Sequence, residues 1–367
     1  MRLVHGFWSK NAFLIGAYLF INFLFVYKYS ARITNLYLTL SLLYSVIVLL
    51  AIGFALHQRG NLQVLSKSTV SFSIVFVLAI LYAVVMFHTD PLSTRVGRYP
   101  ALHTFIHRFL NGDFPYLPGQ NISGFPFLFL LSLPFYLIGD LGLLQIFSFV
   151  IFSVILHKKY EEQKVSYIPL LLLVLSPAFL YEVVVRSELF SNMVLVLFLF
   201  YILERIRPIK SVRTLFLVGI LAGLLLSTRG IVLLPYLIYF VFYFKKDIRS
   251  LTLFGLSTAL GFIITFVPFV IWNKELLIQN NPLAVQKSYI PAWLLILSIL
   301  GCVLIGYSVD TFKRIYRSTA LLVFGVVFFC FVIGMVQNSF DQAVFQSYDI
   351  TYFCFCLPYL LLSFDID

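Results

Sequence analysis

Charged residues are scarce in this chain. Only 11% of its 367 residues are Asp, Glu, Lys or Arg, whereas 61% are hydrophobic. No soluble domain can bury that much apolar surface, so the composition excludes a soluble globular protein. Cysteines are also few, and all four (Cys302, Cys330, Cys354 and Cys356) lie inside apolar runs. This placement argues against a disulfide framework or a cysteine metal site.

Acidic residues are fewer than basic ones, 15 against 26, which gives a net charge of +11. Nucleic-acid binding would fit that balance, but the cations occur in short clusters at 205–213, 245–249 and 313–317, between apolar runs. Clusters of this kind follow from the positive-inside rule of membrane proteins. We therefore expect no nucleic-acid partner, and we place these clusters in the cytoplasm.

Long hydrophobic runs occupy most of the chain. A helix needs about 20 residues to cross a hydrocarbon core, and about thirteen segments approach that length. The sequence predicts an all-α, polytopic transmembrane bundle of about 11–13 spans, forming a single integral membrane domain over 1–367. The segments are 12–27, 37–56, 69–88, 123–139, 142–156, 167–183, 190–204, 214–228, 230–244, 251–272, 292–309, 318–336 and 351–364.

One polar loop, residues 88–124, interrupts these runs. It contains two aspartates, three arginines, three histidines and four prolines, so it must lie in water or at the membrane surface. Within it, residues 98–110 place apolar side chains at helical spacing, with histidines and Arg108 on the other face. We expect an amphipathic helix that lies flat in the interface, with its apolar face in lipid.

The sidedness of the loops can be counted from the basic clusters. The polar loop, Glu188, Arg229 and Asp349 should then all face the outer side. However, three apolar segments separate the polar loop from Glu188, and an odd number places them on opposite faces. We therefore expect one segment within 123–183 not to cross fully; 123–139, interrupted by Pro126 and Pro134, and 142–156 are the candidates.

Asp90 is the candidate general base in the polar loop. It follows an apolar run and precedes Pro91, so its carboxylate lies where water meets hydrocarbon. There it could deprotonate a hydroxyl while a lipid-borne leaving group approaches from the bilayer. The same position also fits an ordinary capping aspartate before a proline turn.

The other ionisable residues of the loop allow two interpretations each. His103 and His107 are four residues apart on one helix face, a spacing that can hold a divalent metal with Asp90 or Asp113. They also fit a wet polar face near anionic headgroups. The arginines Arg95, Arg98 and Arg108 could bind a substrate phosphate or lipid headgroups.

The order of several short elements resembles the polytopic glycosyltransferases of the GT-C type, which are mannosyltransferase-like and use polyprenyl-phosphate sugars. These elements are Asp90, Asn-Gly-Asp-Phe-Pro-Tyr at 111–116, Gly-Phe-Pro at 124–126, Ser-Pro at 176–177 followed by Arg-Ser-Glu at 186–188, the small-residue span at 219–229 that ends in Arg229, and Asp349. Two features depart from the pattern. Two apolar segments precede the one that ends at Asp90, and no large C-terminal soluble domain is seen.

The resemblance implies transfer of a hexose from a polyprenyl phosphate to a glycan or glycolipid, on the outer face of a bacterial cytoplasmic membrane. Asp90 would be the catalytic base, and no cofactor is required, although a divalent metal bound by His103 and His107 would fit. Arg229, Arg98 and Arg95 would bind the donor phosphate. Substrate contacts would come from Glu188, Tyr116, Asp113, Asp349 and Tyr99.

Two alternatives use the same lipid-linked sugars. A flippase or transporter should carry polar groups at mid-span, or broken helices in repeated halves. A glycan polymerase would use basic outer loops, which the arginines of the polar loop would supply. Both share the expected partners, namely lipid-linked sugars and membrane lipids.

Overall fold

The computed structural model describes residues 2–92, 98–117, 122–161, 165–207, 209 and 211–366, with the backbone alone for 2–5 and 59. Within these ranges the regular structure is helical and contains no strand, which confirms the all-α fold. The chain divides into two compact units, each made of segments far apart in sequence. The first unit is Met1–His88, Ile146–Val184 and Tyr316–Asp367, and the second is Thr89–Gln145 and Val185–Ile315.

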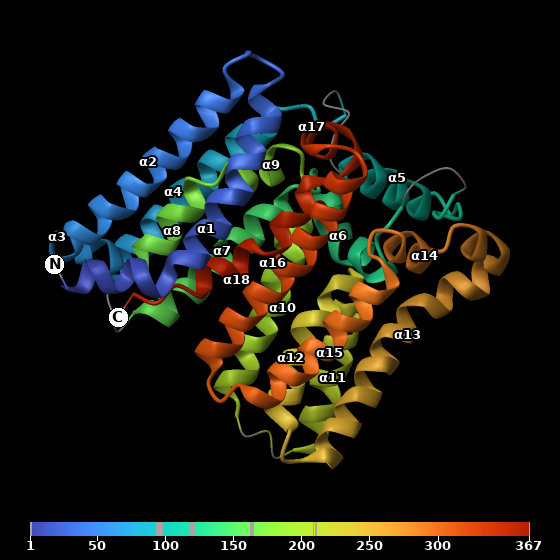
Figure 1. Cartoon of the computed structure of the whole chain (residues 1–367). Helices are drawn as coiled ribbons and strands as arrows, with labels where there is room; N and C mark the ends of the chain where they lie inside the picture. The colour runs from blue at the N-terminus through green and yellow to red at the C-terminus, as the bar shows by residue number, and fades with distance from the viewer. Residues whose placement is uncertain are drawn as a thin grey trace. The chain divides into compact units, whose positions relative to one another are not determined.

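The first unit contains both ends of the chain (Figure 1). Its helices are α1 (Arg2–Ser30), α2 (Tyr37–His57), α3 (Arg59–Leu62), η1 (Gln63–Ser66), α4 (Ser68–Phe87), most of α7 (Leu143–Tyr160), α8 (Tyr167–Val174), α9 (Pro177–Val184), most of α16 (Phe312–Gln337), α17 (Phe340–Gln342), η3 (Ala343–Ser347), η4 (Ile350–Phe355) and α18 (Leu357–Leu362).

The second unit contains the polar loop and the middle of the chain. Its helices are α5 (Tyr99–Leu110), α6 (Pro126–Ile138), α10 (Leu189–Arg205), α11 (Val212–Leu226), η2 (Gly230–Val232), α12 (Leu233–Phe244), α13 (Ile248–Gln279), α14 (Pro282–Lys287) and α15 (Ala292–Ser308).

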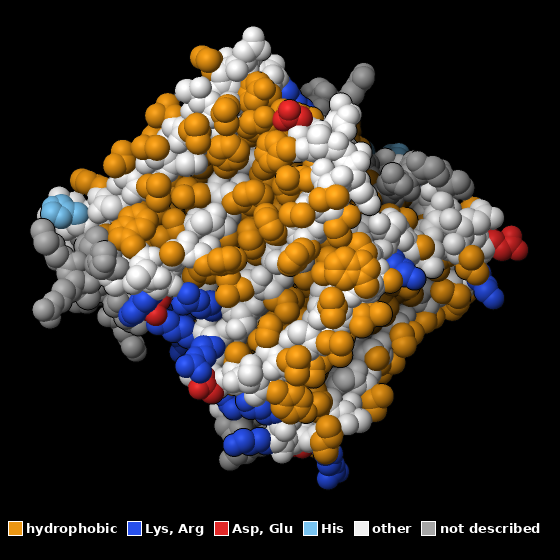
Figure 2. All heavy atoms as spheres, in the orientation of Figure 1, with side chains coloured by type: hydrophobic (Ala, Val, Ile, Leu, Met, Phe, Trp, Pro, Cys, Tyr) orange, Lys and Arg blue, Asp and Glu red, His pale blue; other side chains and the backbone are white. Residues whose placement is uncertain are grey.

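Six helices in the described ranges are long and apolar enough to cross a membrane: α1, α2, α4, α7, α13 and α16. Helices α8 and α9 form a seventh span if the pair, bent by 60°, crosses as one. Apolar side chains cover much of the surface of the helices (Figure 2), as lipid contact requires. The protein is therefore a multi-pass membrane protein. The expected 11–13 spans require that the bent pair and most of the five shorter apolar segments cross as well.

The break between α8 and α9 is stabilised by side chains of the same unit. Asn22 Oδ1 accepts hydrogen bonds from Ser176 Oγ (2.6 Å) and from the Ala178 N–H (3.2 Å). On the other side of the break, the Tyr18 hydroxyl donates to the Leu172 carbonyl (2.6 Å). Backbone groups released by the bend thus find partners inside the protein, which is the condition for a broken helix at membrane depth.

Helices α11 and α13 pack with their backbones in close contact. A Cβ atom added to Gly223 would lie 2.1 Å from the Thr258 carbonyl oxygen, and one added to Gly261 would lie 2.4 Å from the Ile220 oxygen. Small residues on both helices allow this approach. The opposite face of α13 exposes apolar side chains, including Ile271, which is 80% exposed. One face of α13 therefore packs against α11, and the other exposes apolar side chains that suit contact with lipid.

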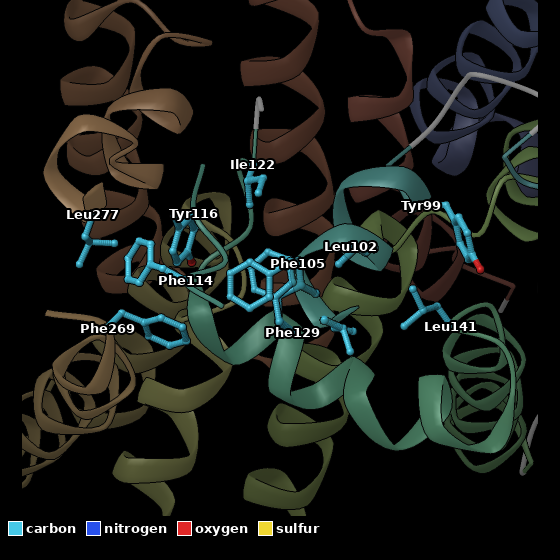
Figure 3. Close-up of a cluster of buried hydrophobic side chains, with 12 residues drawn as sticks. Tyr99, Leu102, Phe105, Phe114, Tyr116, Ile122, Phe129, Leu141, Phe269 and Leu277 are labelled. Carbon is cyan, nitrogen blue, oxygen red and sulfur yellow. The ribbon is translucent and has the colours of Figure 1, made fainter. Parts of the chain in front are cut away.

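The amphipathic helix predicted at 98–110 is confirmed as α5, but its expected environment is wrong. Leu102, Phe105 and Ile106, on its apolar face, are buried in the protein instead of facing lipid. Phe105 stacks on Phe129 of α6 with ring centroids 3.5 Å apart, and Phe269 of α13 completes the cluster (Figure 3). Because α6 and α13 offer an aromatic surface, the apolar stripe of α5 packs on protein.

Substitution of Gly223 by Ala tests the close packing of α11 and α13. The added methyl group meets backbone atoms that cannot move independently, so we expect a loss of about 1–3 kcal/mol of stability. Gly255→Ala on α13 is the matched control, because an added Cβ there meets nothing within 4 Å. Thermal unfolding of the detergent-solubilised protein measures both. Equal midpoints for the two variants would contradict this packing.

Candidate functional site

Four chain segments of the second unit meet at one end of its helices. They are the residues before α6, those after α6, those before α10 and those after α11. Each brings polar or charged side chains to the same place: Ser123, Asp140, Arg186 with Glu188, and Arg229. All of these side chains are buried. The charges must therefore find partners within the protein.

Arg229 and Glu188 form a buried ion pair. The Arg229 guanidinium donates to Glu188 Oε1 and to Ser123 Oγ, and the two charged side chains are 6% and 1% exposed. Glu188 directly precedes α10, and Arg229 lies in the turn between α11 and η2. Glu188 was predicted to contact substrate, and Arg229 to bind the donor phosphate. In the structure they contact each other, and Glu188 neutralises the charge of Arg229.

Gln286 of α14 connects two of the segments beside this pair. Its amide nitrogen donates to the Ser123 carbonyl, and its amide oxygen accepts from the Gly230 N–H (2.6 Å). The backbone strengthens the same junction, because the Phe125 N–H donates to the Thr228 carbonyl (3.2 Å). Gln286 itself is half-buried. It thus lies between the buried ion pair and the surface of the unit.

Arg186 forms the second buried ion pair. Its Nε lies 3.0 and 2.9 Å from the two carboxylate oxygens of Asp140, and one terminal nitrogen donates to the Thr89 carbonyl (2.9 Å). The guanidinium carbon also lies 5.6 Å from the ring centroid of Tyr99. Arg186 has a φ of +51°, in the left-handed region that side chains rarely adopt. Its hydrogen bonds and ion pair offset the cost of this conformation.

Both ends of α6, one of the segments between the polar loop and Glu188, are fixed by contacts within the second unit. Phe125, just before α6, pairs with the backbone at Thr228, and Asp140, just after α6, pairs with Arg186. The residues at both ends of α6 are thus bonded to segments next to Glu188 and Arg229. That one segment within 123–183 does not cross fully stays a prediction, and α6, at 13 residues, is the shorter of its two candidates.

The basic clusters lie at the opposite ends of the same helices. Glu188 precedes α10, whereas Arg205 lies in its last turn, about 25 Å away at 1.5 Å per residue. Lys245 follows α12 and donates to the Val309 carbonyl (2.7 Å) beyond α15. Within the second unit, buried ion pairs therefore mark one end and surface cations mark the other.

Asp90 follows Thr89, whose carbonyl accepts a hydrogen bond from Arg186. Its Oδ1 accepts a hydrogen bond from the Leu92 N–H (3.0 Å), so the carboxylate caps a local turn before the polar loop continues. This contact matches the interpretation of Asp90 as a capping residue. The side chain is also exposed, and the backbone next to it is fixed through Thr89. The geometry therefore leaves the carboxylate within reach of a substrate.

The predicted substrate residues have different surroundings. Tyr99 is largely buried beside Arg186, and this burial raises the pKa of its hydroxyl. Tyr116 is fully buried, and its hydroxyl donates to the Gly124 carbonyl (3.1 Å). This side chain belongs to the aromatic cluster against which α5 packs (Figure 3), and its predicted contact with substrate stays a prediction. Asp113 is exposed and lies 3.7 Å from Arg108.

The remaining residues predicted to bind substrate or the donor phosphate are Asp349, Arg98 and Arg95. Asp349 belongs to the first unit, where its carboxylate accepts from the Thr351 N–H (3.0 Å) and hydroxyl (2.6 Å). Arg98 precedes the first turn of α5. Arg95 lies outside the described residues. The predicted roles of Arg98 and Arg95 in phosphate binding stay predictions.

His103 and His107 lie on the polar face of α5 with nearly parallel rings, 6.1 Å apart between centroids. In the described part of the chain, no group of three or more His, Cys, Asp or Glu side chains is arranged to hold a metal ion. His107 instead exchanges a hydrogen bond with Asn111 (3.2 Å). The geometry therefore favours the wet polar face over the metal site.

Asp140 and Ser123 are functional candidates that the sequence interpretation missed. Asp140 is an isolated acid between Gly139 and Gly142 at the end of an apolar run, and ionisable residues in such positions are informative. That signal could have identified Asp140. No sequence signal distinguishes Ser123 from the other serines of the chain.

No family model matches this chain, and comparisons with curated proteins and with solved structures likewise return no match. Any function must therefore be argued from the residues themselves.

Neutralising Glu188 tests the buried ion pair. Glu188→Gln leaves the Arg229 charge buried without its partner, so we expect a loss of about 3–5 kcal/mol in the free energy of unfolding. Adding Arg229→Gln removes the second charge and should restore more than half of that loss. Asp310→Asn, in an exposed pair with Arg314, is the control and should change little. Additive losses in the double variant would contradict the pairing.

Acidification tests the environment of His103. Burial, with a smaller contribution from the charge of His107, lowers the pKa of His103 below its ordinary 6.5. The unfolded chain then binds more protons than the folded one just below pH 6.5, so stability falls as the pH decreases through that window. We expect His103→Gln to reduce this loss in thermal unfolding between pH 7 and pH 5. The same substitution at exposed His57 is the control, and equal behaviour would contradict the assignment.

Proposed function

We propose that this protein is a membrane glycosyltransferase of the GT-C kind, which transfers a hexose from a polyprenyl phosphate to a glycan or glycolipid. One observation carries the proposal. The exposed carboxylate of Asp90 lies directly after a long apolar helix, and its backbone is fixed through the contact of Thr89 with a buried arginine. A fixed base at the edge of the hydrocarbon suits a reaction between a lipid-borne donor and a polar acceptor.

The reaction follows from this placement. The Asp90 carboxylate takes the proton of an acceptor hydroxyl, and the hydroxyl oxygen forms a bond to the anomeric carbon of the sugar. The bond from that carbon to the phosphate oxygen breaks, and polyprenyl phosphate leaves with the electron pair, so the anomeric configuration is inverted. Arg98 and Arg95, on either side of a short stretch of the polar loop, are the candidates to neutralise the leaving phosphate.

The sidedness of the reaction is proposed from the two ends of the second unit. The positive-inside rule places Arg205 and Lys245 in the cytoplasm, and Glu188, Arg229 and the residues bonded to Arg186 lie at the other end. The reaction would then occur on the outer face of the cytoplasmic membrane of a bacterium. Donor and acceptor would both be presented from that face.

Transport of lipid-linked sugars is the second candidate, because one observation favours it. The bent pair α8 and α9 is a broken helix of the kind that transporters use at their binding sites. The backbone groups next to this bend, however, are bonded to Asn22 and Tyr18. They contribute to stability in this structure, so we place transport second to transfer.

The carboxylate of Asp90 provides the direct test. Asp90→Asn keeps the shape of the side chain but removes the base, so we expect kcat to fall by about 10²–10⁴-fold. Sugar transfer by the purified protein in lipid nanodiscs would be measured with polyprenyl-phosphate hexoses and a glycolipid acceptor extract. Asp310→Asn, exposed in the second unit, is the matched control and should retain wild-type transfer.

Equal transfer by the wild type and by Asp90→Asn would remove Asp90 from the chemistry. Absence of transfer by both proteins, together with movement of the donor across the bilayer, would favour the transporter.

A further inference from the structure

Polar atoms without partners gather around the first turn of α10. In the described chain, five buried atoms there have no hydrogen-bond partner: Ser187 Oγ, Glu188 Oε2, Arg229 Nε, and both the nitrogen and the oxygen of the Asn192 amide. Asn192 is 1% exposed. Buried polar groups in native proteins almost always have partners, so a concentration of exceptions requires an explanation.

The residues that carry these atoms lie together. Glu188 and Asn192 are one helical turn apart, as the hydrogen bond from the Asn192 N–H to the Glu188 carbonyl (2.9 Å) shows. Side chains four residues apart share one face of a helix. Glu188 contacts Arg229 on that face, and α10 packs against the η2 turn that follows Arg229. The carboxylate, the amide and the guanidinium therefore form one polar cluster.

The chemistry of this cluster selects a neutral partner. The charges of Glu188 and Arg229 cancel, so the cluster offers no net attraction for a phosphate. It offers acceptors in Glu188 Oε2 and the Asn192 oxygen, and donors in Arg229 Nε and the Asn192 nitrogen. A hydroxyl group both donates and accepts, and a sugar presents several hydroxyls at close spacing.

We propose that Glu188, Asn192 and Arg229 bind the hydroxyl groups of the transferred sugar. This inference rests on the proposed function and changes one predicted role, because it assigns Arg229 to the sugar instead of the donor phosphate. Asn192 becomes the residue that distinguishes a sugar-bearing lipid from the bare lipid phosphate. Sugar hydroxyls would supply the hydrogen-bond partners that the Asn192 amide does not find among the described residues.

Gln286 is the half-buried side chain beside the cluster. Arg229 donates to Ser123 Oγ, and Gln286 donates to the Ser123 carbonyl. Gln286 also bonds the Gly230 N–H, next to Arg229. Displacement of this single half-buried side chain removes its hydrogen bonds to both segments, although the backbone bond between Phe125 and Thr228 remains.

Substitution of Asn192 tests the proposal without requiring turnover. Thermal unfolding of the full chain in nanodiscs would be measured alone, with polyprenyl phosphate, and with polyprenyl-phosphate mannose or glucose. A ligand that binds the folded state raises the unfolding midpoint, so we expect a larger rise in the wild type for one sugar lipid than for the bare phosphate. In Asn192→Ala and Asn192→Leu this difference should disappear, while the rise with bare phosphate stays.

Two further readouts separate binding from structure. Without ligand, Asn192→Leu should unfold at a higher temperature than the wild type, because an apolar side chain replaces an unpaired buried amide. In transfer assays, Asn192→Ala should raise KM for the sugar donor by about tenfold or more. Asn338→Leu, at an exposed position outside the second unit, is the control for the substitution itself and should retain the difference between the two lipids.

The outcomes distinguish this inference from the proposed function. If the Asn192 variants keep the sugar-dependent rise, or if a transferring wild type has none, the inference is overturned and the glycosyltransferase stands. If Asp90→Asn loses transfer but keeps the sugar-dependent rise, both hold, because binding and catalysis then rest on different residues. If the wild type neither transfers sugar nor gains stability from any sugar lipid, the proposed function fails, and the inference fails with it.

Discussion

Two buried arginines determine how the second unit is organised. Arg186 and Arg229 are almost fully enclosed by protein, and each is bonded to one carboxylate. A buried guanidinium without a counterion is too costly to persist, so each arginine requires a partner from another segment of the chain. The residues before α6, after α6, before α10 and after α11 are brought together by this requirement. The short helix α6 is consequently held at both ends by contacts with the other segments.

The same requirement shapes the two parts of the candidate site. Arg186 holds the backbone beside Asp90 through Thr89, which fixes an exposed carboxylate at the end of an apolar helix. Arg229 and Glu188 cancel each other in charge while leaving polar atoms unpaired around Asn192. In the function that we propose, the base and the sugar-binding cluster depend on different ion pairs. The two pairs are linked through the three consecutive residues Arg186, Ser187 and Glu188.

Hydrocarbon on the outside of the protein explains why so many other polar contacts are internal. At the break between α8 and α9, side-chain partners such as Asn22 replace the hydrogen bonds that a continuous helix would make. Between α11 and α13, where apolar contact with a neighbour gains little over contact with lipid, close packing at Gly223 and Gly261 holds the helices together. The hydrogen bonds at the break and the close helix packing both stabilise a bundle in which the hydrophobic effect contributes little to contacts between helices.

The sequence alone located most of the helices, because hydropathy and the spacing of apolar residues are local properties of the chain, but the predicted segment 167–183 is broken into α8 and α9. The predicted segments 37–56, 190–204 and 292–309 agree within one or two residues with α2, α10 and α15, and α5 was recognised from its periodicity. Only the tertiary structure decided which charges pair. Arg186 and Asp140 are 46 residues apart, and Arg229 and Glu188 are 41 apart. No local pattern in the sequence identifies a pairing partner so far along the chain. The burial of Tyr116, the packing of α5 on protein and the contacts at both ends of α6 were therefore visible only in the folded chain.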